Sequence, residues 1–223
     1  MKRIKLKDRL LPPYSRGEEI INMVTHIVGG GIGILGLLLC LFRALRSADP
    51  FGITGALIYG CALVLLYTVS SVYHGLRPEM GKKVLQIIDH CTIYLLIAGT
   101  YTPIALCALR RADPYLGWGM LTFQWALAAL AVTLTAIDLK KYNVFSMICY
   151  IGMGWAILPF LGIARSVLGQ EGFLFLLLGG IAYTVGAVLY GIGSKQPWFH
   201  SVFHIFVVLG SLLQLICVAF YVL

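Results

Sequence analysis

Charged residues are scarce in this chain of 223 residues: Asp, Glu, Lys and Arg make up 12% of it, against 60% hydrophobic residues. A soluble globular protein carries about 25% charged residues. The scarcity excludes an ordinary soluble protein and predicts one polytopic membrane domain over residues 1–223. A basic tail at residues 1–19 and short connections between apolar runs leave no room for an appended soluble domain.

Signals for processing and for disulfide pairing are also missing. The first apolar run is long and has no small-residue cleavage site, so we expect the first helix to serve as its own insertion signal. The cysteines form no C-x-x-C pair and all lie in apolar stretches. We therefore expect them to be small core residues without disulfides; they are Cys40, Cys61, Cys91, Cys107, Cys149 and Cys217.

Neither nucleic acid nor a nucleotide is an expected partner. The net charge is +8, but the basic residues lie between apolar runs and not on one face, which is typical of contact with lipid headgroups. The stretch "GIGILG" at residues 31–36 matches G-x-G-x-x-G, yet it lies within a hydrophobic helix with no strand before it. Gly29 and Gly33, spaced as G-x-x-x-G, indicate close helix packing instead.

Seven apolar runs are long enough to cross a bilayer as helices, for which about 20 residues are needed. Pro103 and Pro159 fall inside the third and fifth runs, where neighbouring helices can satisfy the freed carbonyls. The predicted fold is all-α, a seven-transmembrane helix bundle, with spans at about 20–42, 51–76, 84–109, 116–137, 144–165, 173–193 and 198–223.

The distribution of Lys and Arg predicts the orientation in the membrane. Twelve lie on one side, in the tail and the even-numbered loops, and five on the other. The positive-inside rule places the N-terminus in the cytoplasm and, with seven spans, the C-terminus outside. The first set is Lys2, Arg3, Lys5, Lys7, Arg9, Arg16, Arg77, Lys82, Lys83, Lys140, Lys141 and Lys195; the second is Arg43, Arg46, Arg110, Arg111 and Arg165.

Ionisable residues inside the spans all fall in the cytoplasmic half of the membrane, as counted at about 1.5 Å per helical residue. His200 and His204 are four residues apart and project from one helix face, and Ser70 and His74 repeat this spacing. Polar faces on four helices predict a shared cavity. The ionisable residues are His26, His74, Asp89, His90, His200 and His204.

This residue set favours a metal site. Zn²⁺ binds neutral imidazole nitrogens, and catalytic sites commonly combine three protein ligands with a water molecule. We expect His74, His200 and His204 to be the ligands. Asp89 is placed to take a proton from the water, whose pKa the metal lowers towards roughly 7. Ser70 is placed to donate a hydrogen bond to a carbonyl oxygen as charge develops on it.

Other polar residues are expected to support this site. Glu19, Asn22 and His26 form an i, i+3, i+7 stripe on the first span that we interpret as a polar brace. His90 points about 100° away from Asp89, so it should line the cavity or bond to the first or second span. Ser71 is assigned to the same polar shell.

Structural interpretations of these residues remain open. The histidine pair alone would suit interfacial residues bonded to headgroups or carbonyls. Asp89 alone could form a bridge with a histidine or a proton relay, and Ser70 or Ser71 alone would most simply pack helices. The convergence of all these residues on one leaflet favours the metal site.

Four segments together resemble the hemolysin III branch of the progestin and adiponectin-receptor family. They are "EIINMVTHIVG", "SSVYH", "IDHCTIYLLIAGTYTP" and "HSVFH", which contain respectively Glu19 to His26, Ser70 to His74, Asp89 to Pro103, and His200 to His204.

The resemblance implies zinc held by His74, His200 and His204, a water-mediated role for Asp89 and a supporting role for Ser70. Because the wider superfamily includes ceramidases, it implies hydrolysis of lipid amides, and the bacterial branch is associated with haemolysis and membrane lipid homeostasis. The chain lacks the long cytoplasmic N-terminal domain of the eukaryotic receptors. This disfavours hormone reception and favours a bacterial inner (plasma) membrane.

Three functions are therefore compared. The first is a zinc-dependent intramembrane hydrolase of lipid amide or ester bonds, with membrane lipids as partners. The second is a non-enzymatic sensor or regulator of the membrane in which zinc is structural. The third, a cytolysin or channel, is disfavoured because the outer halves of the spans, such as "GILGLLLCLF", offer very little polar surface. The sequence indicates neither the substrate lipid nor the oligomeric state.

Overall fold

The computed structural model describes residues 6–193 and 196–223. Over these residues the chain is all-helical and contains no strand, which confirms the predicted fold class. Four basic residues used to predict the orientation lie outside the described residues, namely Lys2, Arg3, Lys5 and Lys195.

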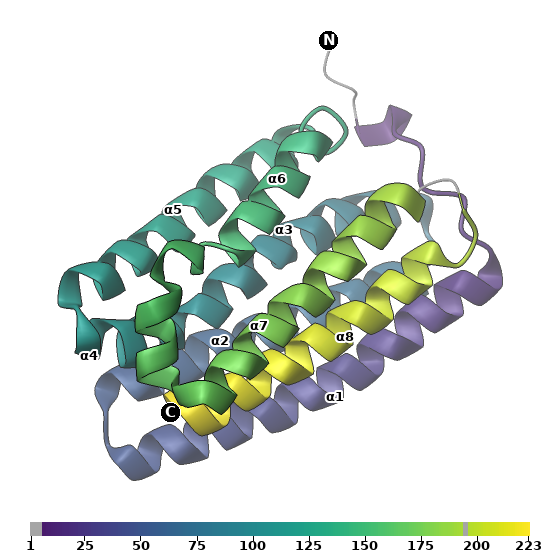
Figure 1. Cartoon of the computed structure of the whole chain (residues 1–223). Coiled ribbons are helices and arrows are strands. Elements are labelled where there is room, and N and C mark those ends of the chain that lie inside the picture. The colour runs from purple at the N-terminus through teal and green to yellow at the C-terminus, as the bar shows by residue number, and fades with distance from the viewer. Residues whose placement is uncertain (1–5, 194–195) are drawn as a thin grey trace.

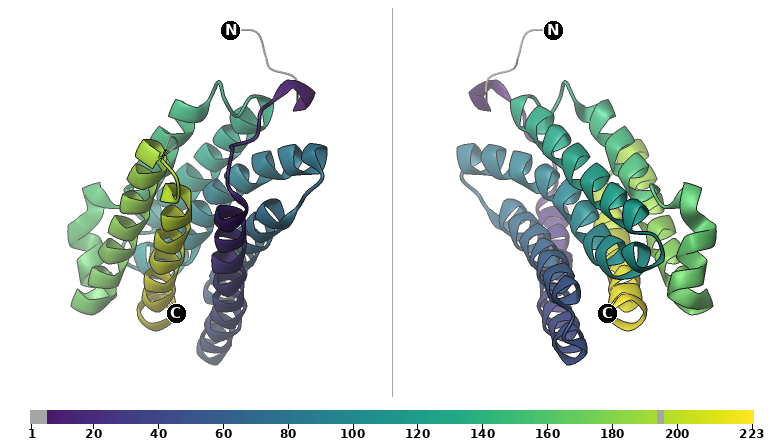
Figure 2. Two further views of the ribbon diagram at one scale, coloured as in Figure 1. Left: turned by 90° about the vertical axis from the view of Figure 1, so that its right-hand side faces the viewer. Right: turned by 90° about the vertical axis from the view of Figure 1, so that its left-hand side faces the viewer.

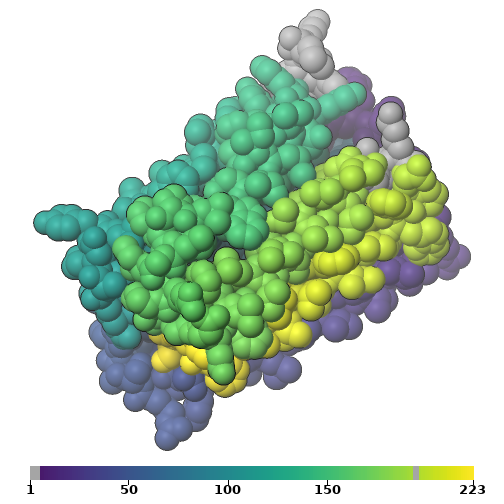
Figure 3. Space-filling model, in the orientation of Figure 1, coloured from purple at the N-terminus to yellow at the C-terminus, as the bar shows by residue number. Residues whose placement is uncertain are grey.

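The helices form one elongated bundle in which neighbours along the chain mostly lie side by side (Figure 1). In chain order the elements are η1 Leu6–Asp8, α1 Arg16–Ser47, α2 Pro50–Gly75, α3 Glu79–Pro103, η2 Ile104–Leu109, α4 Arg110–Ala112, α5 Pro114–Ile137, α6 Asn143–Gly154, η3 Leu158–Phe160, α7 Leu161–Gly193, α8 Phe199–Cys217 and η4 Val218–Val222. In Figure 3, α6, α7 and α8 form the face of the bundle towards the viewer.

Local sequence signals determine where several helices begin. Ser15 and Glu18 form a capping box at the start of α1, in which each side chain accepts a hydrogen bond from the other residue's backbone N–H. Asp49 caps α2 and Asp113 caps α5, each followed by a proline at the first helical position. α3 ends at Pro103, after which the chain continues as the π-helical turn η2.

Small residues let α1 approach α2 closely. A Cβ atom at Gly29 would collide with the ring of Tyr67, and one at Gly33 would lie 3.4 Å from the Cβ of Leu63. The G-x-x-x-G spacing therefore serves helix packing, as predicted from the sequence.

Among the described residues, six helical stretches are long and apolar enough to cross a membrane, and the chain is a multi-pass membrane protein. One stretch, Asn143–Ile192, contains the predicted fifth and sixth spans. It is interrupted between α6 and η3 near Pro159, and again at Gly169, whose φ of +69° is left-handed. The ribbon turns back at the second break (Figure 1). The seven-span count and the orientation remain predictions.

The prediction that all six cysteines are core residues is wrong for one of them. Five cysteines are buried, whereas Cys61 is exposed. Its neighbours one helical turn away on α2, Leu57 and Leu65, are exposed too. Cys61 therefore belongs to an outward apolar stripe, which in a membrane protein contacts lipid.

Candidate metal centre

Three histidines from two helices converge at one end of the bundle. His74 lies in the last turn of α2, and His200 and His204 lie in the first two turns of α8. One ring nitrogen from each lies within 4.8 Å of the others. The Nε2 atoms of His200 and His204 are 3.0 Å apart. His74 and His204 are buried, and His200 is half-buried.

Polar atoms around this cluster lack the hydrogen bonds that buried groups normally make. Among the described residues, Nε2 of His74 and Nδ1 of His200 are buried and make no hydrogen bond. Within the same part of the chain, both ring nitrogens of His26 and both side-chain polar atoms of Asn22 are also unpaired. Neutral imidazole nitrogens gathered in this way are the donor set that Zn²⁺ and related divalent ions take. The group can hold a metal ion.

Glu19 orients the first of these histidines. The Nδ1–H of His74 donates to Oε2 of Glu19 over 2.7 Å, which leaves Nε2 free. Lys82 Nζ donates to the other carboxylate oxygen over 2.6 Å. A carboxylate on the far nitrogen of a metal-binding histidine fixes its tautomer and makes it a stronger ligand. Glu19 therefore lies where the sequence predicts a supporting residue.

The stripe on α1 packs against the same cluster. The ring of His26 stacks on His204 with 3.8 Å between centroids and meets Tyr67 edge-on at 5.0 Å. Asn22 is completely buried one turn earlier. His26 is not one of the three grouped ligands.

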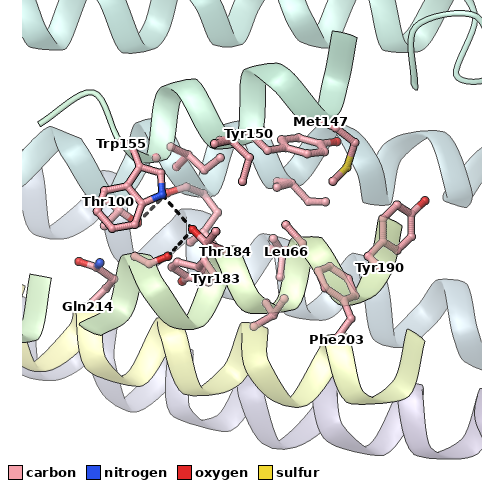
Figure 4. A pocket seen from close by; sticks show the side chains of 18 of the residues that line it. Leu66, Thr100, Met147, Tyr150, Trp155, Tyr183, Thr184, Tyr190, Phe203 and Gln214 are labelled. Carbon is pink, nitrogen blue, oxygen red and sulfur yellow. Dashed lines mark hydrogen bonds between the residues drawn. The ribbon is translucent and has the colours of Figure 1, made fainter. Parts of the chain in front are cut away.

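Asp89 and Ser70 line an apolar cavity whose wall also includes His200 and His204 and residues of α3, α6 and α7. The Ser70 hydroxyl lies within reach of the Asp89 carboxylate. Asp89 belongs to the wall of the cavity and not to the grouped ligands. Hydrophobic residues such as Leu66 and Phe203 line most of the remaining wall (Figure 4).

Two further predicted shell residues bond outside the histidine cluster. His90 lines the cavity, which is one of its two expected positions, and it bonds the Gln86 carbonyl of its own helix and, at 3.3 Å, the Tyr190 hydroxyl of α7. The Ser71 hydroxyl donates to the Tyr67 carbonyl within α2.

The sequence reasoning missed Tyr14. Its ring stacks on His200 with 4.7 Å between centroids and an angle of 15° between planes, and it lies 6.0 Å from the ring of His74. The capping box at Ser15 and Glu18 could have placed Tyr14 at the start of the first helix. Nothing in the sequence indicates which histidine it faces.

The cavity has polar groups at its other end as well. Nε1 of Trp155 donates to the Thr184 hydroxyl over 2.9 Å, and Gln214 lies on the wall nearby (Figure 4). The side chain of Gln214 donates to the Leu176 carbonyl over 2.9 Å. These contacts tie α6, α7 and α8 together beyond the histidines.

Comparison with known proteins shows the family to which the chain belongs. The family model described as "Haemolysin-III related" matches residues 14–215. The chain is 37% identical over 206 residues to Hemolysin-3 of Bacillus cereus, covering 92% of each chain. It is 36% identical over 204 residues to a Hemolysin-3 homolog of Bacillus subtilis, covering 92% of this chain and 94% of the relative.

A human protein is also similar. The chain is 31% identical over 197 residues to the monocyte to macrophage differentiation factor of Homo sapiens, covering 85% of this chain and 78% of the relative. The region matched by the family model, residues 14–215, contains Tyr14, the α1 stripe and all three grouped histidines. Both the family match and the lengths of these similarities lead to one conclusion: the chain belongs to the haemolysin-III-related family of membrane proteins.

Proposed function

We propose that this protein is a zinc-dependent intramembrane hydrolase that cleaves an amide or ester bond of a membrane lipid. The observation that carries the proposal is the convergence of three histidine nitrogens within 4.8 Å beside an apolar cavity that His200 and His204 help to line. A purely structural metal site needs no adjoining cavity, whereas a metal-dependent hydrolase of lipids needs a metal site and a cavity for the lipid.

His74, His200 and His204 are the residues that would hold the ion. When bound, Zn²⁺ supplies a Lewis acid that polarises a carbonyl oxygen and acidifies a water molecule. Glu19 keeps the His74 ring in the tautomer that presents Nε2 to the cluster.

Asp89 and Ser70 have separate roles in this proposal. Asp89 takes a proton from the attacking water and returns it to the leaving group, which is the work of a general base and then a general acid. Ser70 donates a hydrogen bond to the carbonyl oxygen of the substrate, where negative charge develops. Both lie on the cavity wall beside the histidines.

The apolar cavity supports a lipid as substrate. Its wall beyond Asp89 is built mainly from hydrophobic side chains, which suits an acyl chain and excludes water. The scissile bond would then lie at the polar end, in the cytoplasmic half of the membrane. A lipid would reach it sideways from the inner leaflet.

Metal analysis combined with lipidomics tests the proposal. Purified protein should contain about one zinc per chain. Cells carrying His204→Ala should lose both the zinc and the lipid turnover, and cells carrying Asp89→Asn should keep the zinc and lose the turnover. Lipid turnover that persists without the metal would sink the hydrolase proposal.

One observation also favours the second candidate, a membrane sensor with structural zinc. The three histidines bridge α2 and α8, so an ion there would tie the start of α8 to the end of α2. In that case Asp89→Asn should leave the lipid profile unchanged, while His74→Ala should destabilise the bundle. The Asp89 variant therefore separates the two candidates.

A further inference from the structure

His200 differs from His74 in how its ring is held. His74 has a carboxylate on its second nitrogen, whereas Nδ1 of His200 is buried and makes no hydrogen bond among the described residues. Metal-binding histidines usually bond through the second nitrogen, which fixes the orientation of the ring. Besides the 3.0 Å contact of its Nε2 with that of His204, ring packing therefore holds the orientation of His200.

Apart from the ring of His204 at 4.6 Å, itself a candidate ligand, Tyr14 provides the closest ring contact to His200. Its ring lies nearly parallel to that of His200, at 15° and 4.7 Å, whereas Tyr190 and Phe203 contact the same imidazole at 5.7 Å and 5.6 Å with larger angles.

The segment that carries Tyr14, residues 6–15, crosses the end of the bundle and is anchored on both sides; we call it the strap (Figure 2). At its far end Lys83 Nζ donates to the Lys7 carbonyl over 2.9 Å, and Arg9 lies 3.7 Å from Asp138 beyond the end of α5. The side chains of Arg9 and Asp138 are both buried.

The near end of the strap is tied to the helix that carries His200. Ser15 N–H donates to Oε2 of Glu18, and the Trp198 N–H donates to Oε1 of the same carboxylate over 2.8 Å. Trp198 directly precedes α8. Glu18 therefore holds the strap next to the start of α8, where the ring of Tyr14 stacks on His200.

We propose that Tyr14 is a positioning residue that fixes the ring of His200 and, held by the strap, closes the metal centre on its cytoplasmic side. This inference rests on the proposed metal centre but not on hydrolysis. It predicts that the ring, and not the hydroxyl, of Tyr14 controls how long a bound ion is retained.

Zinc release from the purified full-length protein tests this inference. The zinc-loaded protein is mixed with excess chromogenic chelator and the release rate is measured. Tyr14→Ala should release zinc about tenfold faster, within the range found for other residues that orient metal ligands. Tyr14→Phe should behave as the parent. Arg9→Ala, which loosens the strap without touching the histidines, should also accelerate release, whereas Arg16→Ala, an exposed arginine just past the strap, should not.

A second readout follows ligand geometry. With Co²⁺ in place of Zn²⁺, the visible spectrum should change in Tyr14→Ala and be restored in Tyr14→Phe. The inference is overturned if Tyr14→Ala matches the parent in both release rate and spectrum. It is also overturned if Tyr14→Phe releases zinc as fast as Tyr14→Ala. In both cases the metal centre stands. A parent protein that binds neither ion would overturn the metal centre, and the inference with it.

Discussion

Nδ1 of His74 on α2 lies 2.7 Å from Oε2 of Glu19 on α1, so a residue at the start of the first helix orients a histidine at the end of the second. Lys82 neutralises the other oxygen of the same carboxylate from α3. Three helices thus meet at one carboxylate beside the metal centre.

Replacing Glu19 should weaken metal binding without removing the ligands. In Glu19→Gln the amide can still accept from His74, but it is neutral and leaves Lys82 without its ionic partner. We expect a 10- to 100-fold loss of zinc affinity, the range typical of such partners, measured by competition with a fluorescent chelator.

Glu171→Gln is the matched control for this variant. Glu171 is an exposed acid that pairs with the Tyr221 hydroxyl at the other end of the bundle. It should leave zinc affinity unchanged. Equal affinities for the Glu19 and Glu171 variants would show that the carboxylate does not support the site.

Close packing of α1 on α2 should make Gly29 intolerant of any side chain. A Cβ there meets the ring of Tyr67, which is itself buried, whereas a Cβ at exposed Gly31 meets nothing within 4 Å. Gly29→Ala should lower the free energy of unfolding by about 1–3 kcal/mol, as overpacking does. Gly31→Ala should change it by less than about 1 kcal/mol. Thermal unfolding in detergent compares the two, and equal midpoints would contradict the close approach.

The buried pair of Arg9 and Asp138 should hold the strap to the bundle. Removing one member of a buried ion pair is typically destabilising, so Arg9→Ala should destabilise the protein by about 3 kcal/mol. Arg16→Ala removes the same charge from an exposed position and should have little effect.

A double-mutant cycle checks that the two side chains act on each other. Combining Arg9→Ala with Asp138→Asn should cost less than the sum of the two single changes. Strict additivity would mean that the pair contributes nothing. Unfolding in a denaturant series gives all four free energies.

Cysteine labelling from outside intact cells tests the seven spans and their orientation. A membrane-impermeant maleimide should label Tyr115→Cys and Glu171→Cys but not Lys141→Cys, which should become accessible only after permeabilisation. All three positions are exposed. Positions 141 and 171 are expected on opposite sides because residues 143–168 must cross the membrane for the chain to have seven spans. If positions 141 and 171 were labelled from the same side, this segment would not cross.

Helix content and the candidate ligands could be predicted because both depend on short-range patterns. The apolar runs and their capping residues predict helices near their observed bounds, as at α1 and α5. The i, i+4 spacing of His200 and His204 places them on one face of α8, and the count of residues from the membrane surface brings His74 to the same depth. These inferences require only the rise and period of an α-helix.

Contacts between helices were predicted less well. His90 lines the cavity, which is one of its two expected positions, but no pattern in the sequence indicated its contact with Tyr190 on α7. Cys61 was expected in the core, yet it lies on an outward stripe of α2. Apolar residues occur on all sides of a helix in a membrane, so the usual difference between a hydrophobic inner face and a polar outer face is lost.

By itself the sequence determined an all-helical membrane protein with three histidines, an aspartate and a serine at one depth. Only the tertiary structure decided that Glu19 orients His74, that Tyr14 stacks on His200, and that Arg9 anchors the strap at Asp138. Hydropathy and helical period fix the length of a helix and which residues share a face. How helices rotate and cross, and where a non-helical segment lies, depend on packing between distant residues that no local pattern encodes.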